Sequence, residues 1–147
     1  MKLSDILSAD SILLSVKAKN KRQLLQEISQ FAAKSTGLDE RTIFDTLLER
    51  ENLGSTGFGN NAALPHGRLA ELNKVYGFFI KMATPIDYEA IDKKPVDILF
   101  LLLSPESSGA DHLTALAQIS RLLNDKNQVA KLREAETQAE ILAILNS

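Results

Sequence analysis

The chain has 147 residues, of which 44% are hydrophobic and 24% are charged, proportions typical of one globular domain with a sizeable core. The 17 Lys and Arg residues stand against 19 Asp and Glu, so the formal charge of −2 speaks against a nucleic-acid or anionic membrane partner. There is no cysteine, which excludes disulfides, thiol catalysis and thiolate metal sites.

The chain gives no sign of a signal peptide or of membrane insertion. Its start, Met1 to Leu7, becomes polar within four residues. The longest apolar run, Ile98 to Leu103, is far too short to cross a bilayer. We therefore expect a cytoplasmic protein.

The first third of the chain predicts a strand followed by a helix. Apolar residues alternate over residues 12–16, which indicates a strand. Beyond Asn20 the apolar residues recur with helical spacing. Asn20 is a suitable N-cap, and the helix is expected to run to about Ser35 and to end before Gly37.

A second helix is expected to begin after Asp39, which can cap it. Its apolar face comprises Ile43, Phe44, Leu47 and Leu48. The helix should end between Arg50 and Asn52, before a glycine-rich loop that begins at Gly54.

The rest of the chain predicts two longer strands and a helical end. Residues 75–82 are rich in aromatic and β-branched side chains, and residues 96–103 are nearly all apolar, as in a central strand covered on both faces. After a turn at residues 105–109, the pattern is helical from Asp111 onward, with three apolar stripes. We expect a single α/β domain over residues 1–147, with a central mixed sheet of about five strands flanked by helices on both faces.

His66 is the most informative residue of the sequence. It stands between Pro65 and Gly67 on an expected turn, with little bulk around it. A neutral imidazole is plentiful near neutral pH and is nucleophilic. A histidine presented in this way can accept a group, hold it and pass it on, and Gly67 leaves room for a close approach beside it.

A phosphoryl group on such a histidine needs donors aimed at its oxygens. Arg50, at the end of the second helix, offers a fixed fork of donors. His112 lies at a helix start, where the dipole favours an anion and lowers the histidine pKa, so that the neutral ring can donate one hydrogen bond. Asn60 and the glycine-rich loop can add further donors.

Each of these residues also has a purely structural interpretation. A lone loop histidine is more often without a function, an arginine at a helix end more often balances the dipole, and His112 can be an ordinary polar residue of a first turn. The run Gly54–Gly59 is not a P-loop, because no Gly-Lys-Ser/Thr follows. It also lacks the third glycine of a dinucleotide fingerprint, since Ala62 stands there. Two widely separated histidines do not favour a metal site.

Five segments together resemble a known family. They are Leu48–Glu51, Gly54–Gly59, Ala63–Gly67, the apolar strand from Pro95 to Leu103, and Asp111–Leu113. As a set they resemble the IIA domain of the fructose–mannitol type in the bacterial phosphoenolpyruvate-dependent phosphotransferase system. The resemblance covers essentially the whole chain.

This resemblance implies a site and a reaction. The family's phosphorylated histidine falls on His66, through its Nε2 atom, and the supporting residues fall on His112 and Arg50. The implied fold is a mixed five-stranded sheet flanked by helices. The implied donor is a small histidine phosphocarrier (HPr or its nitrogen-branch relative), itself charged by an enzyme I from phosphoenolpyruvate. No metal or nucleotide cofactor is needed, because the phosphate arrives already activated in a P–N bond.

Two branches of the family remain to be separated. Sugar-specific IIA domains pass the phosphate to a IIB domain and often carry a glutamate where Asn60 stands. Nitrogen-related IIA proteins are free-standing, and their phosphorylation state signals to regulatory partners such as potassium-transport or sensor-kinase components. The start of the chain and the run Gly57–Asn60 favour the nitrogen branch. The alternatives are a sugar-specific IIA, and a binding module without catalysis in which His66 is only a surface residue.

Overall fold

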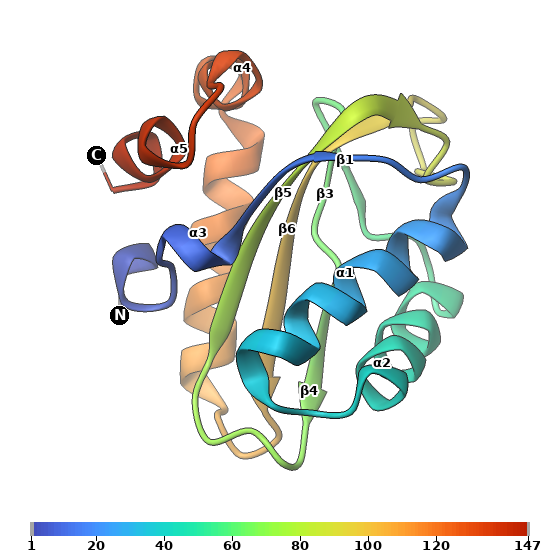
Figure 1. Cartoon of the computed structure of the whole chain (residues 1–147), viewed down its shortest axis with the longest axis vertical. Coiled ribbons are helices and arrows are strands. Elements are labelled where there is room, and N and C mark those ends of the chain that lie inside the picture. The colour runs from blue at the N-terminus through green and yellow to red at the C-terminus, as the bar shows by residue number, and fades with distance from the viewer. Residues whose placement is uncertain (1, 147) are drawn as a thin grey trace.

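The computed structural model describes residues 2–146, in which one sheet lies between two groups of helices (Figure 1). In chain order the elements are the short 3-10 helices η1 (Leu3–Asp5) and η2 (Ala9–Ser11), β1 (Ile12–Val16), α1 (Lys21–Thr36), α2 (Glu40–Asn52), β2 (Gly57–Gly59), β3 (Ala62–Ala63), β4 (His66–Leu69), β5 (Tyr76–Ile86), β6 (Val96–Pro105), α3 (Ala110–Asn124), α4 (Lys126–Glu134) and α5 (Gln138–Leu145). Helices α1 and α2 cover one face of the sheet and α3 the other, with α4 and α5 beside it. The expected α/β architecture, with a mixed sheet and helices on both faces, is confirmed.

Over the described residues, six strands form the sheet; five follow the order β1-β5-β6-β3-β2, and β4 also pairs with β6. Strand β5 runs parallel to β1 and antiparallel to β6, whereas β3 and β4 both run parallel to β6. The two short strands lie one after the other along the same edge of β6 and are separated only by Leu64 and Pro65.

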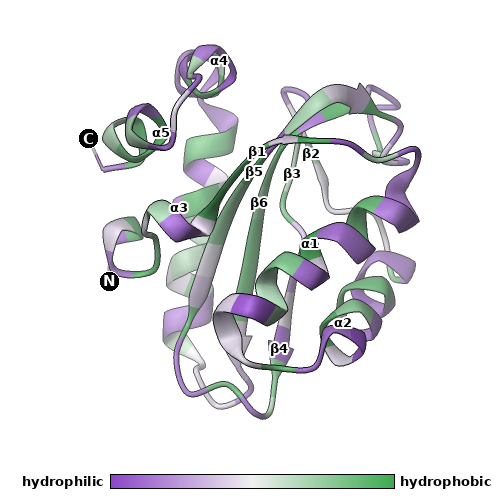
Figure 2. Ribbon diagram, in the orientation of Figure 1, coloured by the Kyte–Doolittle hydropathy of each residue, from purple (hydrophilic) through white to green (hydrophobic). Residues whose placement is uncertain are grey.

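Strand β6 divides the core into two halves. Its buried odd-numbered residues Leu99, Leu101 and Leu103 belong to the cluster beneath α1 and α2. Its even-numbered residues Ile98, Phe100 and Leu102 belong to the cluster beneath α3, α4 and α5. Because side chains alternate across a strand, a strand that is apolar on both faces must be covered on both, and Figure 2 shows β6 as almost continuously hydrophobic.

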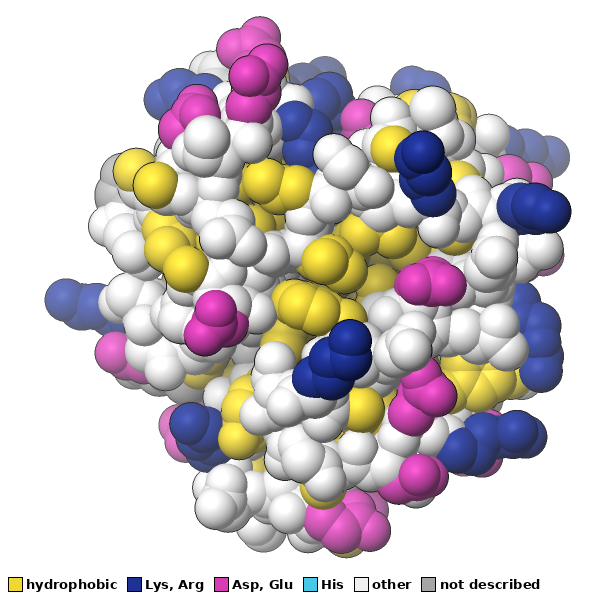
Figure 3. Space-filling view, viewed as in Figure 1, with side chains coloured by type: hydrophobic (Ala, Val, Ile, Leu, Met, Phe, Trp, Pro, Cys, Tyr) yellow, Lys and Arg dark blue, Asp and Glu magenta, His cyan; other side chains and the backbone are white. Residues whose placement is uncertain are grey.

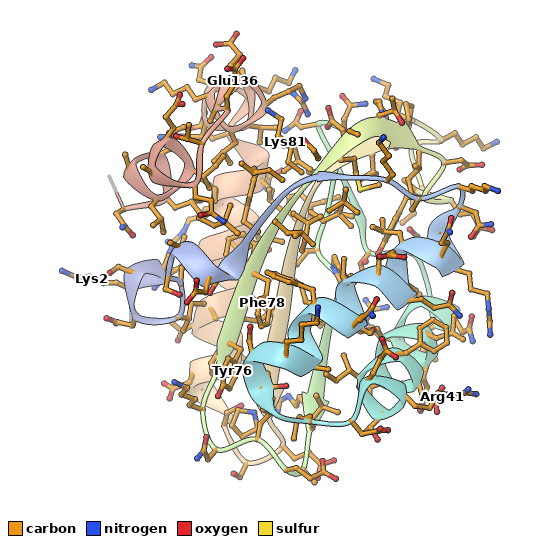
Figure 4. The ribbon with its side chains drawn as sticks, in the orientation of Figure 1. Lys2, Arg41, Tyr76, Phe78, Lys81 and Glu136 are labelled. Carbon is orange, nitrogen blue, oxygen red and sulfur yellow. The ribbon has the colours of Figure 1, made fainter. Side chains whose placement is uncertain are left out.

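Aromatic rings fill the half of the core under α1. Phe78 of β5 makes an edge-to-face contact with Phe31 of α1 at 5.7 Å between centroids, and it stacks on Tyr76 at 6.3 Å. Figure 4 shows Tyr76 and Phe78 near the same end of β5. Such pairs add to the free energy that the buried area alone contributes.

The helix ends follow the capping signals of the sequence. The Asn20 side chain accepts a hydrogen bond from the Gln23 N–H, and Asp39 does the same for Thr42. Gly37 ends α1 with a φ of 76°, a left-handed conformation that glycine adopts without strain. Both predicted helices are confirmed within a residue or two.

The segment from residue 54 to 69 differs from the prediction. The glycine-rich run Gly54–Gly59 contains the first strand of the β2–β3 hairpin, and Asn60 and Asn61 form the two-residue turn of that hairpin with φ values of 55° and 61°. His66 is not on a turn but begins strand β4. These strands have two to four residues, too few for a period-2 pattern to be visible in the sequence.

Candidate functional site

Strand β4 brings His66 to an open corner of the sheet. His66 pairs with Leu102 of β6, and Arg68 pairs with Ser104. Within residues 2–146, β4 pairs with no strand other than β6. Side chains of paired residues in parallel strands point to the same face, so His66, Arg68 and Ser104 lie on the side of α3. In the described part of the chain, the edge of β4 that faces away from β6 is unpaired, and the end of α2 lies near it.

One hydrogen bond fixes the His66 ring. Its Nδ1 lies 2.8 Å from the carbonyl oxygen of Leu64. A carbonyl oxygen only accepts, so the neutral ring carries its proton on Nδ1 and leaves Nε2 with a free lone pair. The tautomer that the bond selects is therefore the one with a nucleophilic Nε2.

His112 lies beside His66 on the first turn of α3. The two ring centroids are 6.0 Å apart, with 50° between the planes. His112 is only 5% exposed, and its Nδ1 lies 2.7 Å from the Oγ of Ser104. When Ser104 donates this bond, the proton of His112 is on Nε2, where it can be donated to an anion beside His66.

Two arginines, Arg50 and Arg68, lie near the two histidines. An open hollow of about 450 Å³ is lined by Arg50, His66, Arg68 and His112, and also by two carboxylates, those of Glu49 and Glu106. The face of the molecule seen in Figure 3 displays no histidine side chain.

The guanidinium of Arg50 is held by the chain around it. Its Nη1 donates to the carbonyl of Gly54 at 2.9 Å, which fixes the side chain across the end of α2. Arg68 makes a weaker contact, 3.5 Å from Nη1 to the carbonyl of Glu106. Arg50 is therefore preorganised, while Arg68 keeps more freedom to adjust to an anion.

Both histidines are less basic than usual. Burial is the main cause that lowers the pKa of His66, and the positive charge of Arg50 adds to it, although the bond to Leu64 and the charge of Glu51 oppose the change. Burial, followed by the charge of Arg68 and that of His66, lowers the pKa of His112 to about 4. The sequence suggested a neutral His112 because of the helix dipole; in the structure, burial and Arg68 are the main causes of the change in pKa.

Asn60 is not part of this site. Its side-chain amide donates to the carbonyl of Leu123 at the other end of α3, and its own carbonyl accepts a bond from Arg133. The carbonyl of the next residue, Asn61, accepts the N–H of Ile98 in β6. Leu102, the residue of β6 that pairs with His66, follows Ile98 by four positions, which is roughly 13 Å along the strand. Asn60, which was expected to donate a hydrogen bond to the phosphate, is instead a residue of the β2–β3 turn.

Gly67 lines the hollow. On the other face of β4, its backbone lies close to Thr46. A Cβ built there would lie 2.7 Å from the Cγ2 of Thr46 in α2. A larger residue would have to displace the Thr46 side chain or push β4 away from α2. Gly67 thus allows the strand that carries His66 to pack closely on the helix that carries Arg50.

The sequence interpretation missed Arg68, Ser104 and the carbonyl of Leu64. Arg68 follows His66 by two residues, and once β4 is known to be a strand the spacing places both on one face. No signal in the sequence indicated that Ser104 meets His112. Among residues 2–146, no three His, Cys, Asp or Glu side chains gather closely enough to hold a metal ion. No helix of that part of the chain is long and apolar enough to span a membrane.

Relatives of this chain share its whole length. A nitrogen regulatory protein of Bradyrhizobium diazoefficiens is 46% identical over 145 residues, which cover 99% of this chain and 95% of the relative. One from Escherichia coli K12 is 38% identical over 146 residues, which cover 99% and 90%. The fructose-specific EIIABC component of Bacillus subtilis is 30% identical over 147 residues, 99% of this chain but 23% of that protein.

Solved structures of related proteins have the same fold as this chain. The crystal structure of the nitrogen regulatory protein IIA-Ntr from Neisseria meningitidis superposes with a TM-score of 0.92 at 33% identity, over 97% of this chain and 98% of the other. IIA mannitol from Escherichia coli shares the fold, with a TM-score of 0.80 at 19% identity over 95% and 98% of the two chains. The model of the family described as phosphoenolpyruvate-dependent sugar phosphotransferase system, EIIA 2, matches residues 5–147, and the chain belongs to that family.

Proposed function

We propose that this protein is a phosphocarrier of the nitrogen-related branch, which accepts a phosphoryl group on Nε2 of His66 from a phosphorylated HPr-like carrier. The observation that carries the proposal is the bond from His66 Nδ1 to the Leu64 carbonyl, at the edge of a hollow that two arginines line. This bond leaves the lone pair of His66 Nε2 free, at a place where the dianionic phosphoryl group meets the positive charges of Arg50 and Arg68.

The step exchanges one P–N bond for another. The lone pair of His66 Nε2 attacks phosphorus as the bond to the donor's imidazole breaks, and the electron pair of the broken bond returns to the donor ring. The proton on His66 Nδ1 stays in place, and the Leu64 carbonyl oxygen that accepts it stabilises the positive charge that forms on the ring. Arg50, Arg68 and the Nε2–H of His112 bind the phosphoryl oxygens. Because both sides of the exchange are phosphohistidines, transfer is close to balanced and reversible.

The nitrogen branch is favoured by the relatives. Nitrogen regulatory proteins are 46% and 38% identical over nearly the full length of both chains, whereas the fructose-specific relative from Bacillus subtilis is 30% identical. We propose that the chain acts in the cytoplasm, where phosphoenolpyruvate is made. There the added dianion changes which regulatory proteins bind around the hollow, with components of potassium transport and sensor kinases as the proposed class.

The test uses purified components. The protein is incubated with labelled phosphoenolpyruvate, an enzyme I and an HPr-like carrier, and the labelled residue is mapped. We expect an acid-labile, base-stable label on His66, and none on the variant His66→Ala. Full labelling of that variant would refute the proposal. Loss of label on adding a fructose- or mannitol-type IIB protein would instead support the sugar-specific function, and a failure of the wild-type chain to take up label would support a binding module.

A further inference from the structure

A buried carboxylate lies one residue from Arg50 and outside the hollow. The side chain of Glu51 is 2% exposed. Its Oε1 accepts the backbone N–H of Thr56 at 3.0 Å and pairs with Lys21 Nζ at 2.9 Å. Its Oε2 accepts the hydroxyl of Tyr88 at 3.1 Å and the hydroxyl of Thr56. A buried carboxylate is costly unless donors surround it, and here two donors satisfy each oxygen.

A continuous path of hydrogen bonds leads from this carboxylate to the His66 ring. Glu51 holds Thr56 through both its backbone and its hydroxyl. The carbonyl of Thr56 accepts the N–H of Leu64 at 3.0 Å. The carbonyl of Leu64 in turn accepts the Nδ1–H of His66 at 2.8 Å. The group that selects the tautomer of His66 is thereby anchored to a buried charge.

A second path leads to Arg50. The loop that joins α2 to β2 is closed by the N–H of Leu53 on the Arg50 carbonyl and by the N–H of Gly54 on the Glu51 carbonyl. The carbonyl of Gly54 accepts Arg50 Nη1. Because Glu51 holds Thr56 at the far end of this loop, it also fixes the place of the Gly54 carbonyl and hence of the guanidinium.

We infer that Glu51 is a positioning residue for the His66 site, which orients the His66 ring through Thr56 and Leu64 and holds Arg50 through the loop of residues 53–56. Neither Glu51 nor any of its partners Lys21, Thr56 and Tyr88 lines the hollow. Glu51 therefore does not touch the transferred group. Its influence on transfer rests on the function proposed above, whereas its influence on the ring does not.

Burial keeps the tyrosine of this cluster, Tyr88, in its protonated form. Burial, with the nearby charge of Glu51, raises the pKa of Tyr88 well above its usual range, so its hydroxyl stays protonated and donates. Lys21 Nζ lies 4.6 Å from the centroid of the same ring. The carboxylate is thus held from α1, from the loop after α2 and from the segment after β5.

The experiment compares Glu51→Gln with Asp97→Asn. Both substitutions turn a carboxylate into an amide and break an ion pair. Asp97 pairs with Arg133 at 2.7 Å, beside the β2–β3 turn and away from His66. The first readout is the pair of ¹⁵N shifts of the His66 ring in the unphosphorylated protein. The second is the rate of label transfer from the phosphorylated carrier, and urea unfolding gives the stability of each variant.

We expect Glu51→Gln to move the ring shifts from the Nδ1–H pattern toward a mixture of tautomers and to slow transfer about tenfold or more. Asp97→Asn should lose stability but keep the wild-type shifts and a rate within about twofold. Thr56→Ser keeps the hydroxyl and should behave like wild type, whereas Thr56→Val removes it and should slow transfer to an intermediate rate.

The inference is overturned if Glu51→Gln is folded and keeps both the wild-type ring shifts and the wild-type rate. It is also overturned if Asp97→Asn changes the shifts and the rate as much as Glu51→Gln does, because the effect would then follow stability alone. A wild-type protein that shows the Nδ1–H pattern but takes up no label would refute the proposed function, while the ring shifts of Glu51→Gln would still test the positioning.

Discussion

The imidazoles of His66 and His112 lie side by side with their centroids 6.0 Å apart, and a different oxygen fixes the Nδ1 of each: the Leu64 carbonyl just before β4 for His66, and the Ser104 hydroxyl near the end of β6 for His112. The two rings are therefore oriented independently, one to attack with Nε2 and the other to donate from it. A phosphoryl group between them would meet a nucleophile and a donor whose positions are set before it arrives.

His112→Ala removes that donor and should slow transfer to His66 by about 10- to 100-fold while leaving His66 able to accept the label. His112→Gln, which keeps an N–H donor, should recover part of the rate. Single-turnover labelling from a phosphorylated carrier measures both, with Thr114→Ala on the exposed side of α3 as the control. An unchanged rate in His112→Ala would remove His112 from the site.

The pH dependence of stability follows from the low pKa of His112. The folded protein holds this ring neutral down to a pH of about 4, whereas in the unfolded chain it takes up a proton near its ordinary pKa of 6.5. The unfolded state therefore binds more protons between these values, so the stabilising contribution is complete above pH 6.5 and is lost as the pH falls toward 4.

We expect the wild-type protein to lose about 1–2 kcal/mol more than His112→Asn between pH 7 and pH 5, as measured by urea unfolding at the two pH values. His66 contributes in the same direction to both proteins, so the difference reports the His112 ring together with its coupling to His66. An equal loss in the two proteins would mean that the ring is not shielded from water as the structure indicates.

The two arginines of the hollow should differ in their effects. Arg50→Ala removes a guanidinium fixed by the Gly54 carbonyl and should lower the transfer rate by about 10²-fold or more. Arg68→Ala should have a smaller effect, since that side chain is exposed and weakly held. Arg50→Lys should restore only part of the rate, because an ammonium lacks the planar fork.

Arg41 is the matched control for these arginines. It lies on the same helix as Arg50, is paired with Asp45 at 2.9 Å, and its side chain is 77% exposed. Figure 4 shows it on the outer side of α2, pointing away from the sheet. Arg41→Ala should transfer at the wild-type rate, and a loss equal to that of Arg50→Ala would show that net charge rather than the local geometry controls the reaction.

The sequence predicted what local chemistry determines. Both capped helices and the two long strands were visible because a cap and a hydrophobic period each act within a few residues. His66, His112 and Arg50 were each identified as candidates, and the structure places all three around one hollow. Labelling of the variants His66→Ala, His112→Ala and Arg50→Ala tests whether these three residues carry out phosphoryl transfer.

Contacts between distant segments were not predictable in the same way. Ser104 reaches His112 only because β6 ends beneath the first turn of α3, and Glu51 meets Tyr88 across 37 residues of sequence. Asn60 was expected to add a hydrogen-bond donor to the site, yet the hairpin turn directs its side chain to the carbonyl of Leu123. Proximity along a chain predicts proximity in space only where the backbone path is already known.

Gly67→Ala tests how tightly β4 is packed on α2. The added methyl would lie 2.7 Å from the Thr46 Cγ2, so Thr46, β4 or α2 must shift, and we expect a loss of about 1–3 kcal/mol in unfolding free energy together with slower transfer. Thr46→Ser removes the methyl that obstructs and keeps the hydroxyl that donates to the Thr42 carbonyl at 2.9 Å.

The double variant Gly67→Ala/Thr46→Ser should therefore recover most of the stability and the rate, and a double-mutant cycle of urea unfolding and labelling measures the coupling. Thr46→Ser alone should be close to wild type. If the double variant were as impaired as Gly67→Ala, the contact with Thr46 would not be the reason that glycine is needed, and the close packing of the His66 strand on the Arg50 helix would have to depend on another contact.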